Sequence, residues 1–302
     1  MIRKTAIIGM GALGLLFGDI IMDAWKRDCV DYILDEDRLL KYREKSFSVN
    51  GKAQNFQMCS AEEAEPYDLV IVAVKWNSLP SALSAMRRCV GEDTIIISAL
   101  NGISSEKIIG EKYGKNRVLC CIAQGMDAMY ANGALCYTKA GELHLGVFDD
   151  VQRPLLEKVC EFFERSSMPY VAEEDILHRL WAKFMLNVGV NQTCAAFGTN
   201  YAGALAPGAA RDAMCGAMRE TIALANAEGI ALSEKDLEIY IEILKTLHPE
   251  GLPSMAQDIV AHRKSEVEMF SGTVIKMSAV HGIKAPINEF LYNKIQEIEA
   301  NF

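Results

Sequence analysis

The chain has 302 residues, of which 50% are hydrophobic and 24% are charged, which is an ordinary composition for a soluble protein. This length is sufficient for two domains with separate hydrophobic cores. The 40 acidic residues outnumber the 31 basic ones, and the net charge is −9. Because nucleic-acid binding needs a basic surface, the charge argues against a nucleic-acid partner.

A glycine-rich motif stands near the N-terminus, between a strand-forming run (residues 5–8) and apolar residues at helical spacing. In such a motif the first glycine permits a tight bend and the second lets the backbone approach a pyrophosphate. The third lets the helix pack closely on the sheet, with its positive end toward the phosphates. The sequence therefore predicts a dinucleotide-binding turn made of Gly9, Met10, Gly11, Ala12, Leu13 and Gly14.

Asp35 distinguishes this turn from an ordinary glycine-rich connection between a strand and a helix, which is the alternative interpretation. Asp35 directly follows the next apolar run, residues 30–34. Its distance from the glycine motif is the one at which an acid that binds ribose hydroxyls is expected. The context of strand, glycine motif, helix and acidic residue together favours a dinucleotide.

The beginning of the chain imitates a secretory signal peptide, because Arg3 and Lys4 precede an apolar run. However, Asp19 and Asp23 stand where small residues of a cleavage site should lie. Nine cysteines without a C-x-x-C pair fit reduced thiols rather than a disulfide framework or a zinc site. We therefore expect a cytoplasmic protein with no bound metal and no membrane span.

The first half of the chain alternates strand and helix patterns, which predicts an open parallel sheet covered on both faces. The expected strands are residues 5–8, 30–34, 69–74, 94–99 and 118–122. The pair Asn50-Gly51 predicts a hairpin turn between 47–49 and 54–58, and a second hairpin is expected between 133–139 and 142–146.

Strand patterns end before residue 175, and helix patterns follow at 175–197, 208–227, 233–247, 254–280 and 288–300. The chain therefore divides into a predicted dinucleotide-binding domain (residues 1–172) and a helical domain (residues 173–302) that would hold the substrate.

Three polar residues on the first predicted helix of the second domain are spaced four apart: Lys183, Asn187 and Asn191. At 100° per residue they fall on one face, and almost all of their neighbours are apolar. The three residues would form a solvated face, a ladder of buried hydrogen bonds or a substrate site.

A second polar segment begins at Ser254, where Gln257 three residues later predicts a capping box at a helix N-terminus. The same N-terminus could receive a substrate carboxylate, and the two roles are compatible. Farther along, the charged stretch around Glu266 has the pattern of a solvated helix face.

The sequence resembles the ketopantoate reductase (2-dehydropantoate 2-reductase) family over nearly its whole length. The most specific matches are Trp181-x-Lys183-x-x-x-Asn187-x-x-x-Asn191 and Ser254-Met255-x-Gln257-Asp258. The remaining matches are the glycine motif, Lys75, Leu100-Asn101-Gly102, Glu266, Gly272, His281-Gly282-Ile283, Pro286 and Asn288.

This resemblance implies a Rossmann-type domain followed by a C-terminal helical domain like that of 6-phosphogluconate dehydrogenase. It implies a cytoplasmic oxidoreductase that reduces ketopantoate to pantoate in pantothenate and coenzyme A biosynthesis, and it allows a homodimer. The implied cofactor is NADPH, which transfers a hydride to the C2 ketone of a small anionic 2-keto acid.

The resemblance also implies roles for individual residues. Lys183 would be the general acid that protonates the forming alkoxide, and Glu266 would bind the substrate hydroxyl and help to hold the lysine. The other implied contacts are with the substrate, from Asn187, Asn191 and Ser254, and with the nicotinamide side of the cofactor, from Asn101.

Three positions depart from the family pattern. Asp35 stands where an arginine usually binds the 2′-phosphate of NADPH, and a carboxylate there favours NADH. Arg38 and Lys75 could still hold the phosphate, so both cofactors stay open. Gly251 and Ser271 each stand where an asparagine is common, which leaves the identity of the keto acid open.

Two alternatives to ketopantoate reduction therefore stand beside it. The first is an enzyme of the same fold that reduces another small branched 2-keto acid, and Gly251 is the residue that suggests it. The second is a module that senses NAD(P) without catalysis. The set Lys183, Asn187 and Glu266 argues against the second, because a sensor has no use for a proton donor.

Overall fold

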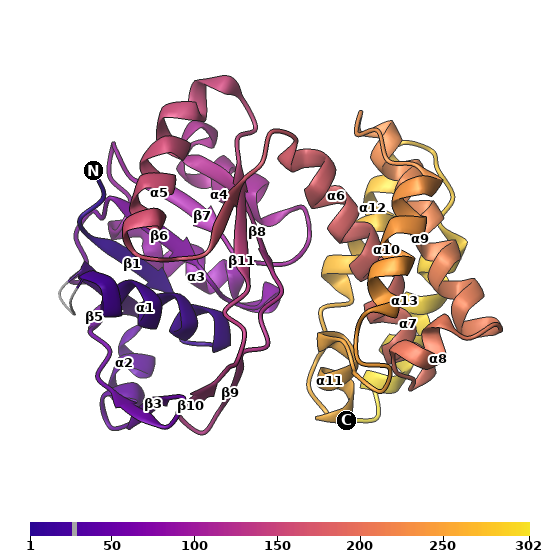
Figure 1. The fold of residues 1–302 in the computed structure, drawn as a ribbon, viewed down its shortest axis with the longest axis horizontal. Coiled ribbons are helices and arrows are strands. Elements are labelled where there is room, and N and C mark those ends of the chain that lie inside the picture. The colour runs from indigo at the N-terminus through magenta and orange to yellow at the C-terminus, as the bar shows by residue number, and fades with distance from the viewer. Residues whose placement is uncertain (26–28) are drawn as a thin grey trace. The chain divides into compact units, whose positions relative to one another are not determined.

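The computed structural model describes residues 1–25 and 29–302 and divides the chain into two compact units, Met1–Ile176 and Leu177–Phe302 (Figure 1). The first unit is built on a twisted sheet with helices on both faces, and the second is helical. This confirms the predicted fold class. The roles assigned to residues 1–172 and 173–302 stay predictions.

Among the described residues, eight strands of the first unit form the main sheet, in the order β12-β11-β8-β7-β6-β1-β2-β5. Neighbouring strands from β5 to β8 are parallel, whereas β11 runs antiparallel to β8. The strands are β1 (Thr5–Ile8), β2 (Val30–Leu34), β5 (Met58–Ser60), β6 (Leu69–Val72), β7 (Ile95–Ser98), β8 (Val118–Gln124), β11 (Glu142–Gly146) and β12 (Tyr170–Ala172).

The two faces of this sheet have separate hydrophobic cores, because successive residues of a strand point to opposite faces. Ile7 belongs to the core that contains Phe17 and Phe163, and Ile8 to the core that contains Leu83 and Ile109. The covering helices are α1 (Ala12–Trp25) and α5 (Arg153–Arg165) on the first face, and α3 (Leu79–Ala85) and α4 (Ser105–Tyr113) on the second. Helix α2 (Glu36–Arg43) follows β2.

A small sheet in the order β4-β3-β10-β9 lies at one end of this unit (Figure 1). Its first hairpin joins β3 (Phe47–Val49) to β4 (Lys52–Gln54) through Asn50 and Gly51, which have φ angles of 47° and 79°. Positive φ at both central residues is typical of the hairpin turn that Asn-Gly predicts, so this prediction is confirmed, with the second strand starting earlier than expected.

The predicted second hairpin, between 133–139 and 142–146, is wrong. The turn is Asn132-Gly133, with φ angles of 50° and 87°, and it joins β9 (Met129–Ala131) to β10 (Ala134–Cys136). Strand β11 leaves this sheet and pairs with β8 and β12 of the main sheet. The hairpin therefore lies one strand earlier in the chain than the sequence predicts.

The second unit consists of helices and two π turns. They are α6 (Ile176–Leu186), the π turn η6 (Asn187–Asn191), α7 (Gln192–Phe197), α8 (Tyr201–Leu205), α9 (Ala209–Ala227), α10 (Glu234–Lys245), α11 (Ser254–Val260), the π turn η7 (Glu268–Gly272), α12 (Thr273–Val280) and α13 (Pro286–Glu299). No helix in the described ranges is apolar over a length that would cross a membrane.

The single helix predicted over 254–280 is wrong, because α11 ends at Val260. His262 has a φ of 49°, the Arg263 N–H donates to the Asp258 carbonyl (2.9 Å), and the His262 N–H donates to the Ile259 carbonyl (3.0 Å). This is a helix end with a left-handed residue, a position that glycine usually occupies. Histidine in that place gives no sequence signal for a break.

Candidate functional site

The glycine motif of the first unit has the geometry that its sequence predicts. Gly9 has a φ of 114°, and a Cβ there would lie 2.4 Å from the Ala73 carbonyl oxygen. A Cβ on Gly14 would lie 2.0 Å from the Gly9 carbonyl oxygen, so only glycine lets α1 approach the turn this closely. A Cβ on Gly11 would meet nothing within 4 Å, and this residue is exposed. The turn is therefore tight at two glycines and open at the middle one.

The first turn of α1 suits an anion. The helix begins at Ala12 directly after Gly11, and its first turn contains no acidic residue. The unpaired N–H groups and the partial positive charge of a helix N-terminus attract phosphate. The residues present thus fit the pyrophosphate of a dinucleotide.

A pocket beside this turn brings together four of the predicted cofactor residues: Gly9, Met10, Asp35 and Arg38. Its other lining residues are mostly apolar: Ile8, Ile33, Leu34, Tyr42, Val74, Ser81, Ala82 and Ala85. This small pocket therefore places four predicted cofactor residues beside apolar side chains.

Asp35 has a structural role that the sequence analysis missed. Its Oδ1 accepts a hydrogen bond from the Arg38 N–H (2.8 Å), so Asp35 is the N-cap of α2. The Arg38 Nε lies 3.5 Å from the other carboxylate oxygen, and both side chains are about half exposed (51% and 50%). A phosphate bound here would meet Arg38 already paired with a carboxylate.

Lys75 and Asn101 follow β6 and β7; β6 pairs with β1, and β7 is the next strand beyond β6. Because β1, β2, β6 and β7 are parallel, their carboxyl ends lie at one edge, which also carries the glycine turn and Asp35. The fold therefore collects all the predicted cofactor residues at one edge of the sheet, where open α/β sheets bind their ligands.

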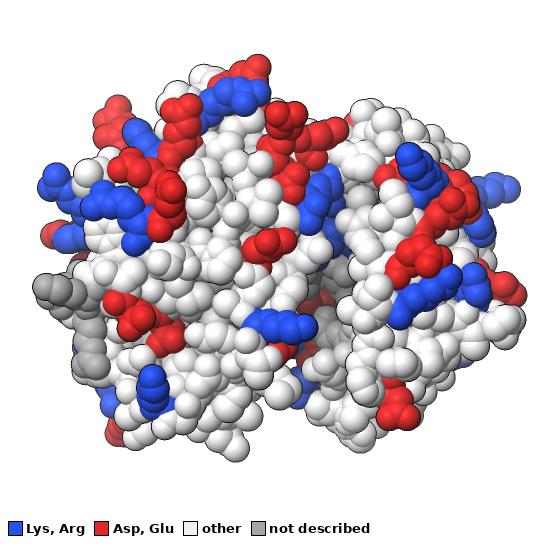
Figure 2. Space-filling model, viewed as in Figure 1, with Lys and Arg blue, Asp and Glu red and all other residues white. Residues whose placement is uncertain are grey.

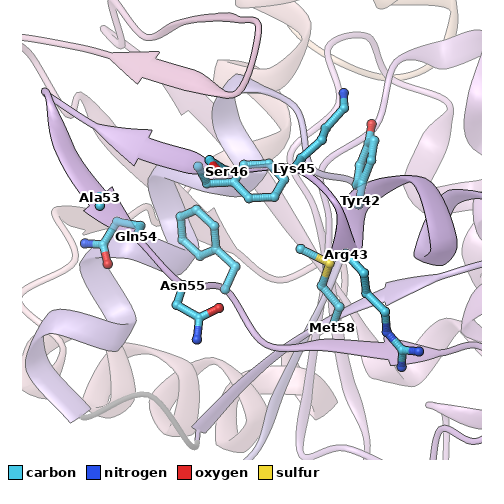
Figure 3. A pocket seen from close by; sticks show the side chains of 10 residues that line it. Tyr42, Arg43, Lys45, Ser46, Ala53, Gln54, Asn55 and Met58 are labelled. Carbon is cyan, nitrogen blue, oxygen red and sulfur yellow. The ribbon is translucent and has the colours of Figure 1, made fainter.

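Tyr42 lines both this pocket and a larger one of about 400 Å³, drawn in Figure 3. The larger pocket contains the edge-to-face rings of Phe47 and Phe56, and the side chains of Arg43 and Lys45 point away from each other at its rim. Tyr42 aside, its lining comes from the end of α2 and the β3–β5 region and includes none of the predicted site residues.

The face shown in Figure 2 has acidic and basic side chains interspersed over both units, with wide uncharged areas between them. A continuous basic stripe, which nucleic-acid binding would need, does not appear among the described residues of that face.

In the second unit, Lys183 lies on α6 and the helix continues through the π turn η6, which begins at Asn187 and ends at Asn191. A π turn contains one more residue than an α turn, so the predicted spacing of 100° per residue fails over its second half. Asn187 and Asn191 are 9% and 6% exposed, which excludes a solvated face. Buried carboxamides need hydrogen-bonding partners, and a polar substrate can provide them.

A buried hydrogen-bond network joins the two π turns. The Gln192 amide, directly after η6, donates to the Val188 carbonyl (2.7 Å) and accepts from the Ser271 N–H (3.0 Å) in η7. The Ser271 hydroxyl contacts both the Gln192 Oε1 (2.5 Å) and the Asn288 Oδ1 (3.2 Å). The Asn288 side chain in turn donates to Glu220 (2.7 Å). These contacts fix η6 relative to η7.

The structure gives Ser271 a different role from the one that the sequence suggests. As a departure from the family pattern it suggests an altered substrate pocket, but its side chain has no exposed surface and its hydroxyl contacts Gln192 and Asn288. Ser271 is thus part of the packing of the helical unit.

The predicted capping box at Ser254 is wrong. Pro253 is the N-cap of α11, and the Gln257 side chain donates to the Leu252 carbonyl (2.8 Å) instead of bonding to Ser254. The serine side chain is exposed at the start of the helix. Since the helix does not continue to Glu266, the ~18 Å rise that a straight helix would impose between these residues does not apply.

The comparisons with known proteins agree over both units. Residues 5–150 match the profile of the family described as Ketopantoate reductase PanE/ApbA, and residues 175–299 match its C-terminal profile. The chain belongs to the ketopantoate reductase family. Members of this family are NAD(P)H-dependent 2-keto acid reductases, which confirms the predicted family and enzyme class.

Individual relatives of the family are distant. The 2-dehydropantoate 2-reductase of Pyrococcus abyssi is 25% identical over 98% of both chains. A dimeric ketopantoate reductase from Staphylococcus aureus is 20% identical, with a TM-score of 0.81 over 99% of both chains. A D-mandelate dehydrogenase solved with NADH and anilino(oxo)acetate is 22% identical, with a TM-score of 0.85 over 99% of this chain and 98% of that one. At this distance the structures show the shared fold and leave the substrate open.

Gly251 has a packing partner in this member of the family. A Cβ at residue 251 would lie 3.1 Å from two ring carbons of Tyr201 and 3.0 Å from the His248 carbonyl oxygen. The Tyr201 N–H also donates to the Gly251 carbonyl (3.2 Å). The tyrosine ring therefore stands close to where the asparagine side chain of other members would begin.

We expect Gly251→Asn to lower the free energy of unfolding by about 1–3 kcal/mol, because the new Cβ overpacks the site against Tyr201. Urea unfolding measures the change. In the Gly251→Asn/Tyr201→Ala double variant the two effects should be less than additive, because the ring that the asparagine displaces is gone. Strictly additive effects would show that the ring is not the obstacle.

Proposed function

We propose that the protein is a cytoplasmic 2-dehydropantoate 2-reductase, which reduces ketopantoate to pantoate with NADPH in pantothenate and coenzyme A biosynthesis. The proposal assigns the cofactor to the first unit and the keto acid to the second. The observation that carries it is the occurrence in one chain of the open glycine turn at Gly11 and the buried Asn187 and Asn191 downstream of Lys183.

A nicotinamide cofactor held by the glycine turn would supply the hydride that reduces the C2 ketone of the substrate. Negative charge then develops on the ketone oxygen, and a cationic donor stabilises it and transfers a proton. In the proposed mechanism Lys183 donates that proton from its Nζ, and Glu266 accepts a hydrogen bond from the product hydroxyl and orients the lysine. Asn187, Asn191 and Ser254 bind the carboxylate and hydroxyl groups of the substrate.

The cofactor site is proposed to consist of the glycine turn with Asp35, Arg38, Lys75 and Asn101. NADPH follows from the family resemblance, and NADH is the alternative that Asp35 supports, since its carboxylate accepts hydrogen bonds from ribose hydroxyls and repels a phosphate. The bound NADH of the D-mandelate dehydrogenase structure is a further reason to test it.

A second candidate is the reduction of another small 2-keto acid on the same fold. Two observations favour it: the aromatic ring of Tyr201 beside Gly251, and the likeness to a D-mandelate dehydrogenase. A homodimer is also proposed, by analogy with the dimeric enzyme of Staphylococcus aureus.

The test is the initial rate of oxidation of NADPH and of NADH, measured in parallel with ketopantoate and with an aromatic 2-keto acid. We expect turnover of ketopantoate with NADPH. Turnover of the aromatic acid alone would favour the second candidate, and turnover with NADH alone would make Asp35 the selector. Binding of a cofactor without oxidation by either acid would contradict the proposal and support a sensing role.

A further inference from the structure

We infer that Glu299 is a positioning residue for the reduction, because its carboxylate fixes the backbone next to Glu266. The inference rests on the proposed function, in which Glu266 contacts the substrate. Glu299 is the last residue of α13, far in sequence from the segment that it holds.

The carboxylate of Glu299 is buried, with only 3% of the side chain exposed. Its Oε1 accepts a hydrogen bond from the Ser265 N–H (2.8 Å), and its Oε2 lies 3.2 Å from the Lys264 Nζ. A bond from a backbone N–H to an ionised, buried carboxylate is about twice as strong as one between neutral groups. The residue directly before Glu266 is therefore held by its backbone.

The other side of Glu266 is fixed by the start of η7. The Glu266 carbonyl accepts from the N–H groups of Met269 (2.9 Å) and Phe270 (3.2 Å), and the Phe270 side chain is fully buried. The Ser265 hydroxyl accepts from the Val267 N–H (3.3 Å). The backbone is therefore held on both sides of Glu266, whose side chain is half-buried.

Between α11 and η7 the chain has no helix or strand, so contacts with other elements define its path. One of them is the parallel stack of His262 on Phe302, with ring centroids 5.2 Å apart. Another is the Arg263 guanidinium on Asp258 (2.8 Å). Both contacts are made by residues several positions before Glu266, whereas the Glu299 carboxylate binds the N–H of Ser265, the adjacent residue. Of these three contacts, the bond to Glu299 is the nearest in sequence to Glu266.

A misplacement of a reacting group by about 1 Å can cost about 10²-fold in rate. We expect Glu299→Ala to lower kcat by about 10- to 100-fold, with an unchanged Kd for NADPH, because the cofactor residues lie in the other unit. Glu299→Gln should stay within about threefold of wild type, since its amide oxygen still accepts from the Ser265 N–H. Glu299→Asp keeps the charge but shortens the reach, and should also lower kcat.

Glu268→Ala is the matched control. Glu268 lies two residues from Glu266 and accepts hydrogen bonds from Tyr292 and from Lys276 (3.2 Å), so its loss removes similar contacts from the same segment. Its kcat should stay within about threefold of wild type, because neither partner holds the backbone of Glu266.

The Glu266→Gln background separates positioning from simple support of the fold. There, Glu299→Ala should have little further effect on kcat, because the group that it positions is already disabled. Equal losses in both backgrounds would overturn the inference, as would wild-type kcat in both Glu299→Ala and Glu299→Asp. Wild-type kcat in Glu266→Gln alone would instead contradict the role of Glu266 in the proposed function.

Discussion

Replacing Lys183 by alanine should lower kcat by about 10²–10⁴-fold, which is the usual contribution of a general acid. The hydride places negative charge on the ketone oxygen, and without the ammonium group that charge is stabilised only by neutral donors such as Asn187. Because Lys183 lies on α6 and the glycine turn lies in the first unit, the Kd for NADPH should change little.

Steady-state rates at saturating ketopantoate and NADPH measure this effect, and nucleotide fluorescence measures the Kd. Lys245→Ala is the control, because that lysine is exposed on α10 and pairs only with Glu242 among the interactions described (2.6 Å). A Lys183→Ala enzyme with near wild-type turnover would remove this residue from the mechanism.

Replacing Asp35 by asparagine should raise the ratio of kcat/KM for NADPH to that for NADH by roughly 10- to 100-fold, equivalent to about 1.4–2.8 kcal/mol. Asparagine removes the charge that repels a 2′-phosphate and frees Arg38 from its carboxylate partner. It also remains a good helix N-cap, so α2 keeps its bond to the Arg38 N–H.

Parallel kinetics with both nucleotides give the ratio. Asp35→Ala is the matched variant, because it removes the cap together with the charge. It should show the same change in nucleotide preference but a free energy of unfolding lower by about 0.5–2 kcal/mol. An unchanged ratio in both variants would mean that Asp35 does not face the ribose and that the preference is set elsewhere.

The sequence predicted those parts of the fold that are determined by the local pattern of residues. The buried aliphatic runs became β6 and β7, and Asn50-Gly51 became a hairpin turn. It could not predict that β11 returns antiparallel to β8, because that pairing depends on contacts between distant segments. The helix end at His262 was missed because no glycine or proline marks it.

In the candidate site, too, local features could be predicted and features that depend on distant contacts could not. The close backbone contacts at Gly9 and Gly14 follow from their places in the motif, and the role of the turn in cofactor binding stays a prediction. The cap formed by Asp35 and the buried position of Ser271 could not be predicted, since each depends on which neighbour the side chain meets. A sequence alone does not distinguish a polar residue that contacts a ligand from one that is buried in the core.

The two π turns have an evolutionary consequence. Each behaves as a single-residue insertion in an otherwise regular helix, and such insertions are frequently retained at functional sites. Deleting one residue from η6 would restore α geometry and rotate everything after it by about 100°, which would move Asn191 and Gln192 away from their present neighbours. Since Gln192 reaches η7 through Ser271, losing the insertion in η6 would also break this contact with η7. Divergence within this helical unit is therefore expected to proceed by substitution and to leave the lengths of both helices unchanged.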